Sequence, residues 1–190
     1  ADLDAAAQRL VPLVEAVRND RALQIAQRRR PITGISEFPN AAETLPERAP
    51  YPVAPQVHRY AGEFEQMRDE PMAQPVFLAT LGPIAAHTAR ATFAINLLAA
   101  GGIGIGSAGP TADVAEVLDK YLEAGAPPVV CLAGTDAAYG EWGADLVAAL
   151  RENGASYVVV AGKTDLGQDA SAAMGLDALA FLRQMREVLA

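Results

Sequence analysis

The segment Val129-Val130-Cys131-Leu132-Ala133 is apolar at all five positions and follows two prolines. A continuous apolar run of this length indicates a strand buried on both faces, whereas strict alternation would indicate one face in water. Similar runs lie at residues 76–81 and 157–161, with weaker strand candidates at 103–105 and 170–174. We therefore expect a parallel sheet with helices on both faces.

Helical segments separate these strand candidates. The sequence predicts helices over 85–100, 111–124, 138–152 and 176–189, with Thr111 as an N-cap and glycines after several of the helices. Strands alternating with helices are typical of a doubly wound α/β domain. We expect a flavodoxin-like domain over residues 76–190.

The first 75 residues have a different texture. Residues 1–30 have a helical composition, and Pro12 predicts two helices, the second capped by Asp20. Residues 32–35 predict one short strand. One strand cannot close a core, so residues 1–40 are interpreted as the end of a larger barrel or sheet. Prolines follow at 39, 46, 50, 52, 55, 71 and 75. They predict a linker over 41–75, with a short helix at 61–70.

Composition excludes several classes of protein. Of the 190 residues, 51% are hydrophobic and 20% charged, which is typical of a globular chain, and the formal net charge is −8. Nucleic acids and anionic membranes require clustered basic residues, so neither is an expected partner. There is no apolar run of roughly 18 residues and no signal-peptide pattern, so we expect a cytoplasmic chain. One cysteine and two histidines argue against a disulfide framework and a zinc site.

Two motifs near the carboxyl ends of the predicted strands merit attention. His87 follows the first strand, where open α/β sheets bind ligands, but no Asp, Glu or Cys accompanies it; a partly exposed histidine without a ligand is the alternative. The stretch Gly104-Ile105-Gly106-Ser107-Ala108-Gly109 matches G-x-G-x-x-G. It follows the second strand and is succeeded by Pro110, so its context is wrong for a dinucleotide site.

Three further candidates have ordinary structural explanations. Cys131 lies within a strand and is interpreted as a buried, inert thiol. Acidic residues and one lysine follow the third and fourth strands, at Asp136, Glu141, Lys163 and Asp165. They are similar to a receiver-domain phosphorylation site, which also requires acidic residues after the first strand, where Thr80-Leu81-Gly82 stands. Residues 28–30 are three arginines that suit either a phosphate or a solvated helix end.

Segments in a fixed order resemble the small, non-catalytic β subunit of methylmalonyl-CoA mutase. They are RRPITGISEFPN at 29–40, VFLATLGP at 76–83, HTARATFA at 87–94 and GLDALAFL at 175–182. The first segment resembles the end of that family's substrate-binding (β/α)8 barrel. The other three resemble the first strand, first helix and closing helix of its cobalamin-binding domain. The resemblance implies a barrel remnant over 1–40, a Pro-rich linker over 41–75 and a cobalamin-binding-like domain over 76–190.

The family's cobalamin-binding members carry Asp-x-His-x-x-Gly, in which the histidine is the lower cobalt ligand and the aspartate orients it. At the matching positions this chain has Ile84, Ala86 and Ala89, and His87 stands one position late. The later Ser-x-Leu and Gly-Gly motifs correspond to Ala133-Gly134-Thr135 and Ala161-Gly162. These departures predict that the chain binds no cobalamin and has neither catalytic residues nor a metal site.

The first hypothesis is therefore a C-terminal fragment of the non-catalytic subunit of a heterodimeric isomerase. The resemblance implies that the holoenzyme interconverts methylmalonyl-CoA and succinyl-CoA in propionate metabolism, with adenosylcobalamin on the large catalytic subunit. Two alternatives remain open. One is a cobalamin carrier or sensor that uses His87 as the cobalt ligand. The other is a stand-alone flavodoxin-like domain that binds a nucleotide.

Overall fold

Five parallel strands form one sheet in the computed structural model, which describes residues 3–40, 43–44 and 59–190. The strands are β1 (Val76–Thr80), β2 (Ile105–Ser107), β3 (Val129–Ala133), β4 (Tyr157–Ala161) and β5 (Ala170–Ala172). Their order across the sheet is β2-β1-β3-β4-β5, and every neighbouring pair is parallel. This is the flavodoxin-like order, so the predicted fold class is confirmed.

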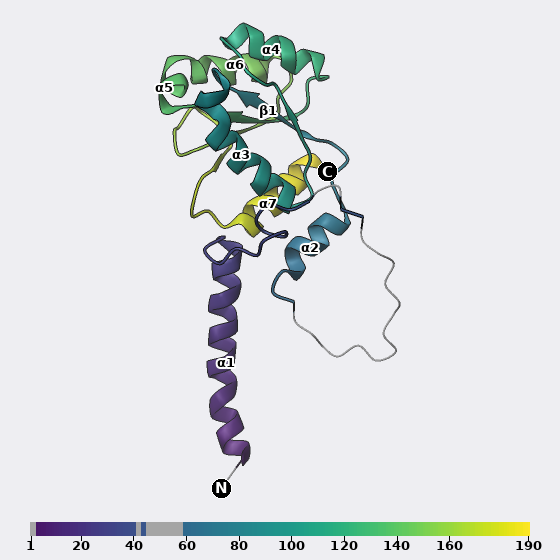
Figure 1. The fold of residues 1–190 in the computed structure, drawn as a ribbon, viewed down its shortest axis with the longest axis vertical. Coiled ribbons are helices and arrows are strands. Elements are labelled where there is room, and N and C mark those ends of the chain that lie inside the picture. Colours follow the sequence, from purple (N-terminus) through teal and green to yellow (C-terminus); the bar gives the residue numbers. More distant parts are fainter. Residues whose placement is uncertain (1–2, 41–42, 45–58) are drawn as a thin grey trace.

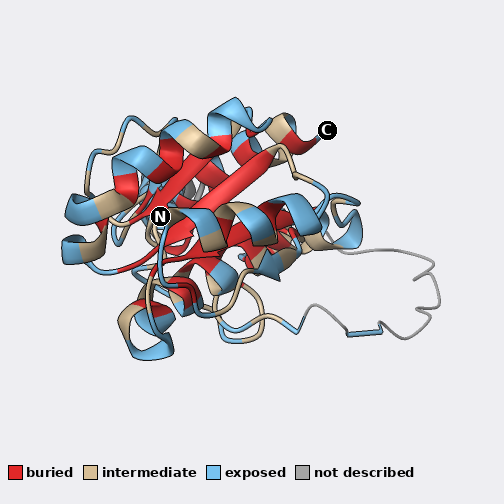
Figure 2. Ribbon diagram, turned by 90° about the horizontal axis from the view of Figure 1, so that it is seen from above, coloured by how far each residue is buried: buried red, intermediate tan, exposed pale blue. Residues whose placement is uncertain are grey.

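Helices cover both faces of the sheet (Figure 1). One face carries α3 (Ile84–Ala100) and α7 (Ala178–Leu189), and the other carries α4 (Val114–Glu123) and α6 (Ala144–Glu152). Alternate residues of β1 enter the two cores: Leu78 packs on the α3 side and Phe77 on the α4 side. Figure 2 shows the resulting buried layer between the two sets of helices.

The core residues of the sheet are fully buried except at one outer strand. The side chains of Val76, Leu78, Val129, Leu132, Val158 and Val160 are all fully buried. Ile105 is only half-buried, because β2 is an outer strand of three residues. The opposite outer strand, β5, is equally short and coincides with the start of the weak candidate at 170–174.

Several element boundaries differ from prediction. Helix α4 begins after Asp113, whose carboxylate accepts the N–H of Glu116, so Asp113 and not Thr111 is the N-cap. Thr111 is buried and donates its hydroxyl to the Thr80 carbonyl. The helix predicted over 138–152 starts earlier, as α5 (Asp136–Ala138), and passes through a π-helical turn, η1 (Tyr139–Gly143). Helix α7 is capped by Asp177, two residues later than expected.

Helix α1 (Leu3–Ala26) corrects the prediction of two helices, because it runs through Pro12 without a break. Proline removes one backbone hydrogen bond, but the neighbouring turns consist largely of good helix formers. The helix projects away from the sheet (Figure 1). Only its last turn, at Ile25 and Ala26, joins the core on the α3 side.

The strand predicted at 32–35 is a tight hook instead. The N–H groups of Ile35 and Ser36 both bond to the Ile32 carbonyl, and a single bridge joins Thr33 to Glu37. Gly34 permits this turn because its φ is +81°. The hook lies against α3, since Asn96 accepts the Phe38 N–H and donates to Glu37. Residues 25–38 therefore pack within this chain.

Helix α2 (Gly62–Asp69) matches the short helix predicted at 61–70. It packs through Phe64 and Met67 onto the α3 side of the core. Arg68 donates to the Gly34 carbonyl at 2.7 Å, which ties α2 to the hook. Residues 41–42 and 45–58 of the predicted linker lie outside the described residues.

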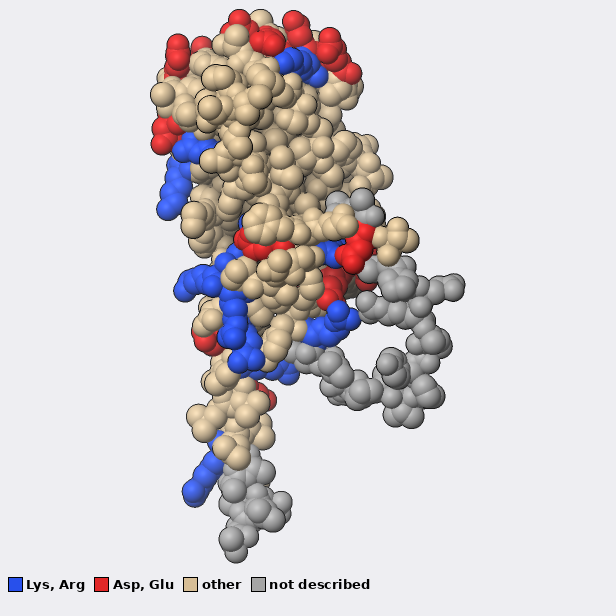
Figure 3. Space-filling view, viewed as in Figure 1, with Lys and Arg blue, Asp and Glu red and all other residues tan. Residues whose placement is uncertain are grey.

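Charge is distributed unevenly along the sequence. Residues 101–180 contain eleven acidic and only three basic residues, which equals the net charge of −8 for the whole chain. In Figure 3, acidic side chains crowd the end formed by α4 and α6, while most basic side chains lie near the hook and α2. Within the described ranges, no helix has the length and apolar content needed to cross a bilayer.

Candidate functional site

The carboxyl ends of β1, β3 and β4 meet at one edge of the sheet. Chain connections run in opposite directions from β1 and β3, because β2 lies outside β1 while β4 and β5 lie beyond β3. Ligands of open α/β sheets bind at such a switch point. The residues that follow these three strands are therefore the place to look for a site.

His87 lies in the first turn of α3, beside this edge, but its side chain turns inward. It is 6% exposed, and its Nδ1 lies 3.1 Å from the Gly82 carbonyl. The carbonyl can only accept, so Nδ1 donates its N–H to it. This corrects the expectation of a partly exposed histidine. The helix begins at Ile84, so His87 is already held by helical backbone.

The residues around His87 do not fit cobalamin. A carbonyl on Nδ1 is an arrangement that ligating histidines use, but a ligand to cobalt must present its other nitrogen at an open surface, and His87 is buried. The side chains of Ile84 and Ala86 offer no ligand or orienting carboxylate. We derive no cobalamin-dependent step for this chain.

Arg90 is the centre of the polar contacts at this edge, and sequence reasoning missed it. Its guanidinium donates to the Gly134 carbonyl at 2.7 Å and to Asp136 Oδ1 at 2.5 Å. The guanidinium carbon also lies 4.9 Å from the centre of the Tyr139 ring. The hydrogen bond and charge of Arg90 hold the pKa of Asp136 below its ordinary value. Arg90 thus connects α3 with the loop after β3.

Tyr139 joins β3 to β4 beneath this arginine. Its buried hydroxyl accepts the Gly134 N–H and lies 3.0 Å from the carbonyls of both Leu132 and Ala161. Burial raises the pKa of Tyr139 to about 12, so the phenol stays neutral and can donate to one of these carbonyls. The π-helical turn that starts at Tyr139 places the ring under Arg90. The tyrosine is a structural hub and not an acid or base for a ligand.

The loop after β1 is closed in a similar way. The Thr80 hydroxyl donates to the Gly109 carbonyl, and Thr111 donates back to the Thr80 carbonyl at 2.5 Å. Gly109 is the last glycine of the G-x-G-x-x-G match, and four residues separate it from the start of α4. The motif therefore does not lead directly into a helix N-terminus, as a pyrophosphate site requires.

The remaining sequence candidates separate in space. Asp136 and Lys163 line one pocket with Arg90, whereas Glu141 and Asp165 do not. Cys131 is buried, and burial raises the pKa of its thiol to about 12, as expected for an inert cysteine. Arg28 is not a solvated helix end: its guanidinium pairs with Glu37 at 2.6 Å and lies over the Phe93 ring. No group of three or more metal-ligating side chains occurs in the described part of the chain.

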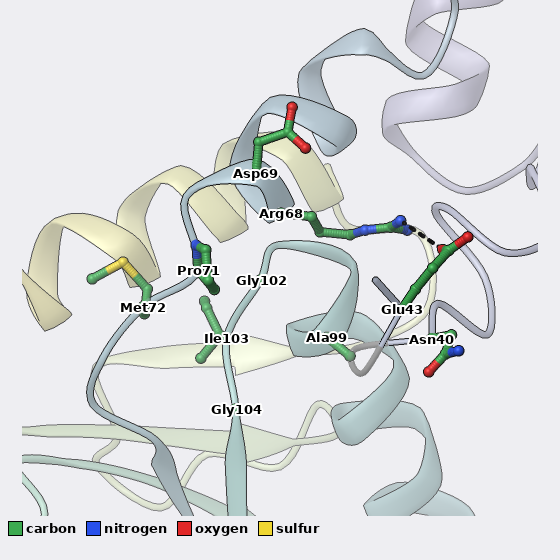
Figure 4. A pocket seen from close by; sticks show the side chains of 10 residues that line it. All are labelled: Asn40, Glu43, Arg68, Asp69, Pro71, Met72, Ala99, Gly102, Ile103 and Gly104. Atoms are coloured by element: carbon green, nitrogen blue, oxygen red, sulfur yellow. Dashed lines mark ion pairs between the residues drawn. The ribbon is translucent and has the colours of Figure 1, made fainter. Parts of the chain in front are cut away.

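A second pocket, of about 340 Å³, lies at the opposite edge of the sheet (Figure 4). Arg68 and Glu43 face each other across it at 3.8 Å, and Met72, Ile103 and Gly104 form its other side. The side chain of Asp69 points away from that ion pair. Ile103 and Gly104, which line this pocket, come directly before β2, at the amino ends of the strands. Domains of this fold bind their ligands at the carboxyl ends.

The sequence is similar to those of several named proteins. Probable methylmalonyl-CoA mutase small subunits of Mycobacterium tuberculosis (strain ATCC 25618 / H37Rv) and Mycobacterium bovis are 44% identical over 150 residues, which is 75% of this chain and 24% of each relative. The methylmalonyl-CoA mutase small subunit of Streptomyces virginiae is 38% identical over 183 residues, 89% of this chain and 29% of the relative. The chain is homologous to methylmalonyl-CoA mutase small subunits.

The resemblance seen in the sequence is thereby confirmed. The methylmalonyl-CoA mutase small subunit of Propionibacterium freudenreichii subsp. shermanii is also similar, with 29% identity over 202 residues, 96% of this chain and 31% of the relative. No protein-family model matches the chain. The chain spans about a quarter to a third of the length of these small subunits.

Proposed function

We propose that this chain is part of the non-catalytic small subunit of a methylmalonyl-CoA mutase. The holoenzyme would interconvert methylmalonyl-CoA and succinyl-CoA in propionate metabolism, with adenosylcobalamin held by a large catalytic subunit. The observation that carries the proposal is the 44% identity to the mycobacterial small subunits. The site geometry supports a non-catalytic role, because Arg90, Asp136 and Tyr139 at the strand ends are engaged with one another.

The exposed part of α1 supports a docking role. Four apolar side chains on successive turns, Leu10, Leu13, Val14 and Val17, are each about 60% exposed. A helix that is exposed and apolar over this length is stable in water only at a cost, so we propose that protein covers it in the complete assembly. We propose that this covering protein is the large catalytic subunit.

We also propose the domain division of the complete subunit. Residues 1–40 would end a preceding (β/α)8 barrel, residues 41–75 would link it to the next domain, and residues 76–190 would form the cobalamin-binding-like domain. The hook at 32–38 is bonded to α3, so the proposed boundary between barrel and domain is a packed junction and not a free tether.

Co-expression with a methylmalonyl-CoA mutase large subunit tests the assembly. The complete small subunit should co-elute with it as a heterodimer, and Leu13→Glu with Val17→Glu should weaken that association. Glu123→Ala, on the acidic end of the molecule, is the matched control and should leave association unchanged. Isomerisation by this chain alone with added adenosylcobalamin would contradict the non-catalytic role.

The carrier hypothesis makes a different spectroscopic prediction. A histidine-ligated cobalamin would give a base-off, His-on spectrum that His87→Ala abolishes. We expect no such spectrum with this chain, since His87 is buried against the Gly82 carbonyl.

A further inference from the structure

A pocket of about 700 Å³ opens at the carboxyl ends of β4 and β5, against one side of α3. Arg90 and Phe93 reach it from α3, Asp136 comes from the start of α5, and Lys163 and Thr164 come from the loop after β4. Met174, just after β5, forms its rim. Four separate segments thus converge on one cavity of a size that small ligands occupy.

The polar side of the pocket carries a net positive charge. Arg90 and Lys163 are the cations in its lining, and Asp136 is the one carboxylate. Among the described residues, Lys163 has no ion pair or hydrogen bond, and the Asp136 side chain is 77% exposed where it meets Arg90. A ligand anion can therefore pair with Lys163 and approach the outer edge of the Arg90 guanidinium. Lys163, unlike Arg90, lies within the acidic part of the sequence, residues 101–180.

The Arg90 guanidinium is held ready for such a contact. Its face is fixed by the Tyr139 ring, and one of its nitrogens is fixed by the Gly134 carbonyl. Gly162 leaves room for it, because a Cβ at that position would lie 3.4 Å from the guanidinium carbon. A charged group that is already ordered loses little entropy when an anion binds.

The other side of the pocket is apolar. Phe93 is half-buried, and Met174 is 84% exposed, the largest exposed fraction among the large hydrophobic side chains described. Ala161, Ala172 and Ala173 lie between them and keep the cavity open. An apolar body in the pocket would cover Met174 and contact the Phe93 ring, which gains free energy in proportion to the area removed from water.

We propose that this pocket binds a small organic anion, with an apolar body against Phe93 and Met174 and a carboxylate or phosphate on Lys163 and Arg90. The inference does not rest on the role proposed for the subunit, since the pocket lies within the described α/β domain. It concerns residues that the mutase hypothesis leaves unused.

Nuclear magnetic resonance titration of the full 190-residue chain tests the proposal, with hexanoate, hexyl phosphate and 1-hexanol as probes. The two anions should shift the amides of Phe93, Gly162 and Thr164 in a saturable way at millimolar concentration. Hexanol should bind at least about tenfold more weakly, because a charge-assisted contact is worth roughly one such factor. The tighter anion identifies the preferred headgroup.

Matched variants locate the contact. Lys163→Gln should weaken binding of the tighter anion about tenfold. Lys120→Gln removes the only other lysine, which pairs with Glu116 outside the pocket, and should leave affinity unchanged. Met174→Ser should weaken the anions and hexanol alike. The proposal is overturned if no saturable shift occurs, if hexanol binds as tightly as the anions, or if the two lysine variants behave the same.

Discussion

At the scale of single residues, Arg90 shows how one side chain can connect the segments that follow the strands of an α/β domain. It bonds the carbonyl after β3, pairs with Asp136 and covers Tyr139. The loop after β3 is thereby tied to α3. This residue, and not His87, organises the site.

The Asp136 carboxyl should titrate below its ordinary pKa of 3.8 because Arg90 donates to it and lies beside it. A carboxyl whose pKa is depressed by folding contributes stability above the unfolded value, and this contribution is lost as the pH falls through the folded value. We expect a carbon-detected titration to place Asp136 below 3.8 in the native chain and near its ordinary value in Arg90→Ala. An unchanged Asp136 titration in that variant would show that the ion pair does not form in solution.

Residue identity alone could not have predicted this cluster. Arg90 and Asp136 are 46 positions apart, and their meeting depends on β1 lying directly beside β3. His87 stood out in the sequence because histidine is rare and chemically versatile, but its helical position turned it inward. The usable signal for Arg90 was its place near the start of the helix predicted over 85–100, beside the predicted switch point.

At the scale of elements, the central strands were the easiest to predict. The bounds of β3 and β4 match the sequence prediction because both are uninterrupted apolar runs that begin near proline or serine and end at glycine. Helix α1 was the hardest to predict. Its proline favours a break, but the strong helix formers on both sides of Pro12 keep the helix continuous. The β-branched residues at 32–35 predict a strand. The same residues also fit a turn held by Gly34 and Ser36, which the sequence pattern does not distinguish from a strand.

Strand β1 should be the most sensitive element to truncation. Leu78 is fully buried in the sheet between β2 and β3, so Leu78→Ala should lower the free energy of unfolding by about 2–5 kcal/mol. Ile95→Ala on the exposed side of α3 should change it by less than roughly 0.5 kcal/mol. Urea denaturation measures both, and equal effects would mean that the two cores are not organised around β1.

The turn between α3 and β2 depends on Gly102. Its φ is +70°, and a Cβ there would lie 2.6 Å from the Met67 carbonyl oxygen of α2. Gly125, after α4, has a similar φ of +85° with no atom within 4 Å. Both alanine substitutions carry a left-handed backbone penalty of about 1–2 kcal/mol, but only Gly102→Ala must also displace α2.

Thermal unfolding of the two variants separates these costs. Gly102→Ala should lower the melting temperature clearly more than Gly125→Ala does. Equal losses in the two variants would indicate that α2 does not rest on this turn.

At the scale of the whole molecule, the two ends of the chain differ in the surface that they present to solvent. The end formed by α4 and α6 is acidic (Figure 3). Helix α1 projects away from the sheet (Figure 1), and its apolar side chains Leu10, Leu13, Val14 and Val17 are exposed. Hydrogen exchange should reflect this difference. We expect slow exchange in β1, β3 and β4, and fast exchange over residues 8–20 of α1 in the isolated chain.

Hydrogen exchange of the complete small subunit should also be measured with and without a mutase large subunit. The amides of residues 8–20 should become protected in the complex, whereas those of α4 should not change. Protection confined to α4 would place the partner on the acidic end and contradict the docking role proposed for α1.

The brevity of the two outer strands has a consequence for colloidal behaviour. Parallel sheets fold slowly and present unpaired backbone groups at their margins, which other molecules can extend into fibrils. Here β2 and β5 are only three residues each, so a neighbouring molecule finds almost no template on which to add a strand. We therefore expect the addition of a strand from a second molecule to be unfavourable at both margins of the sheet.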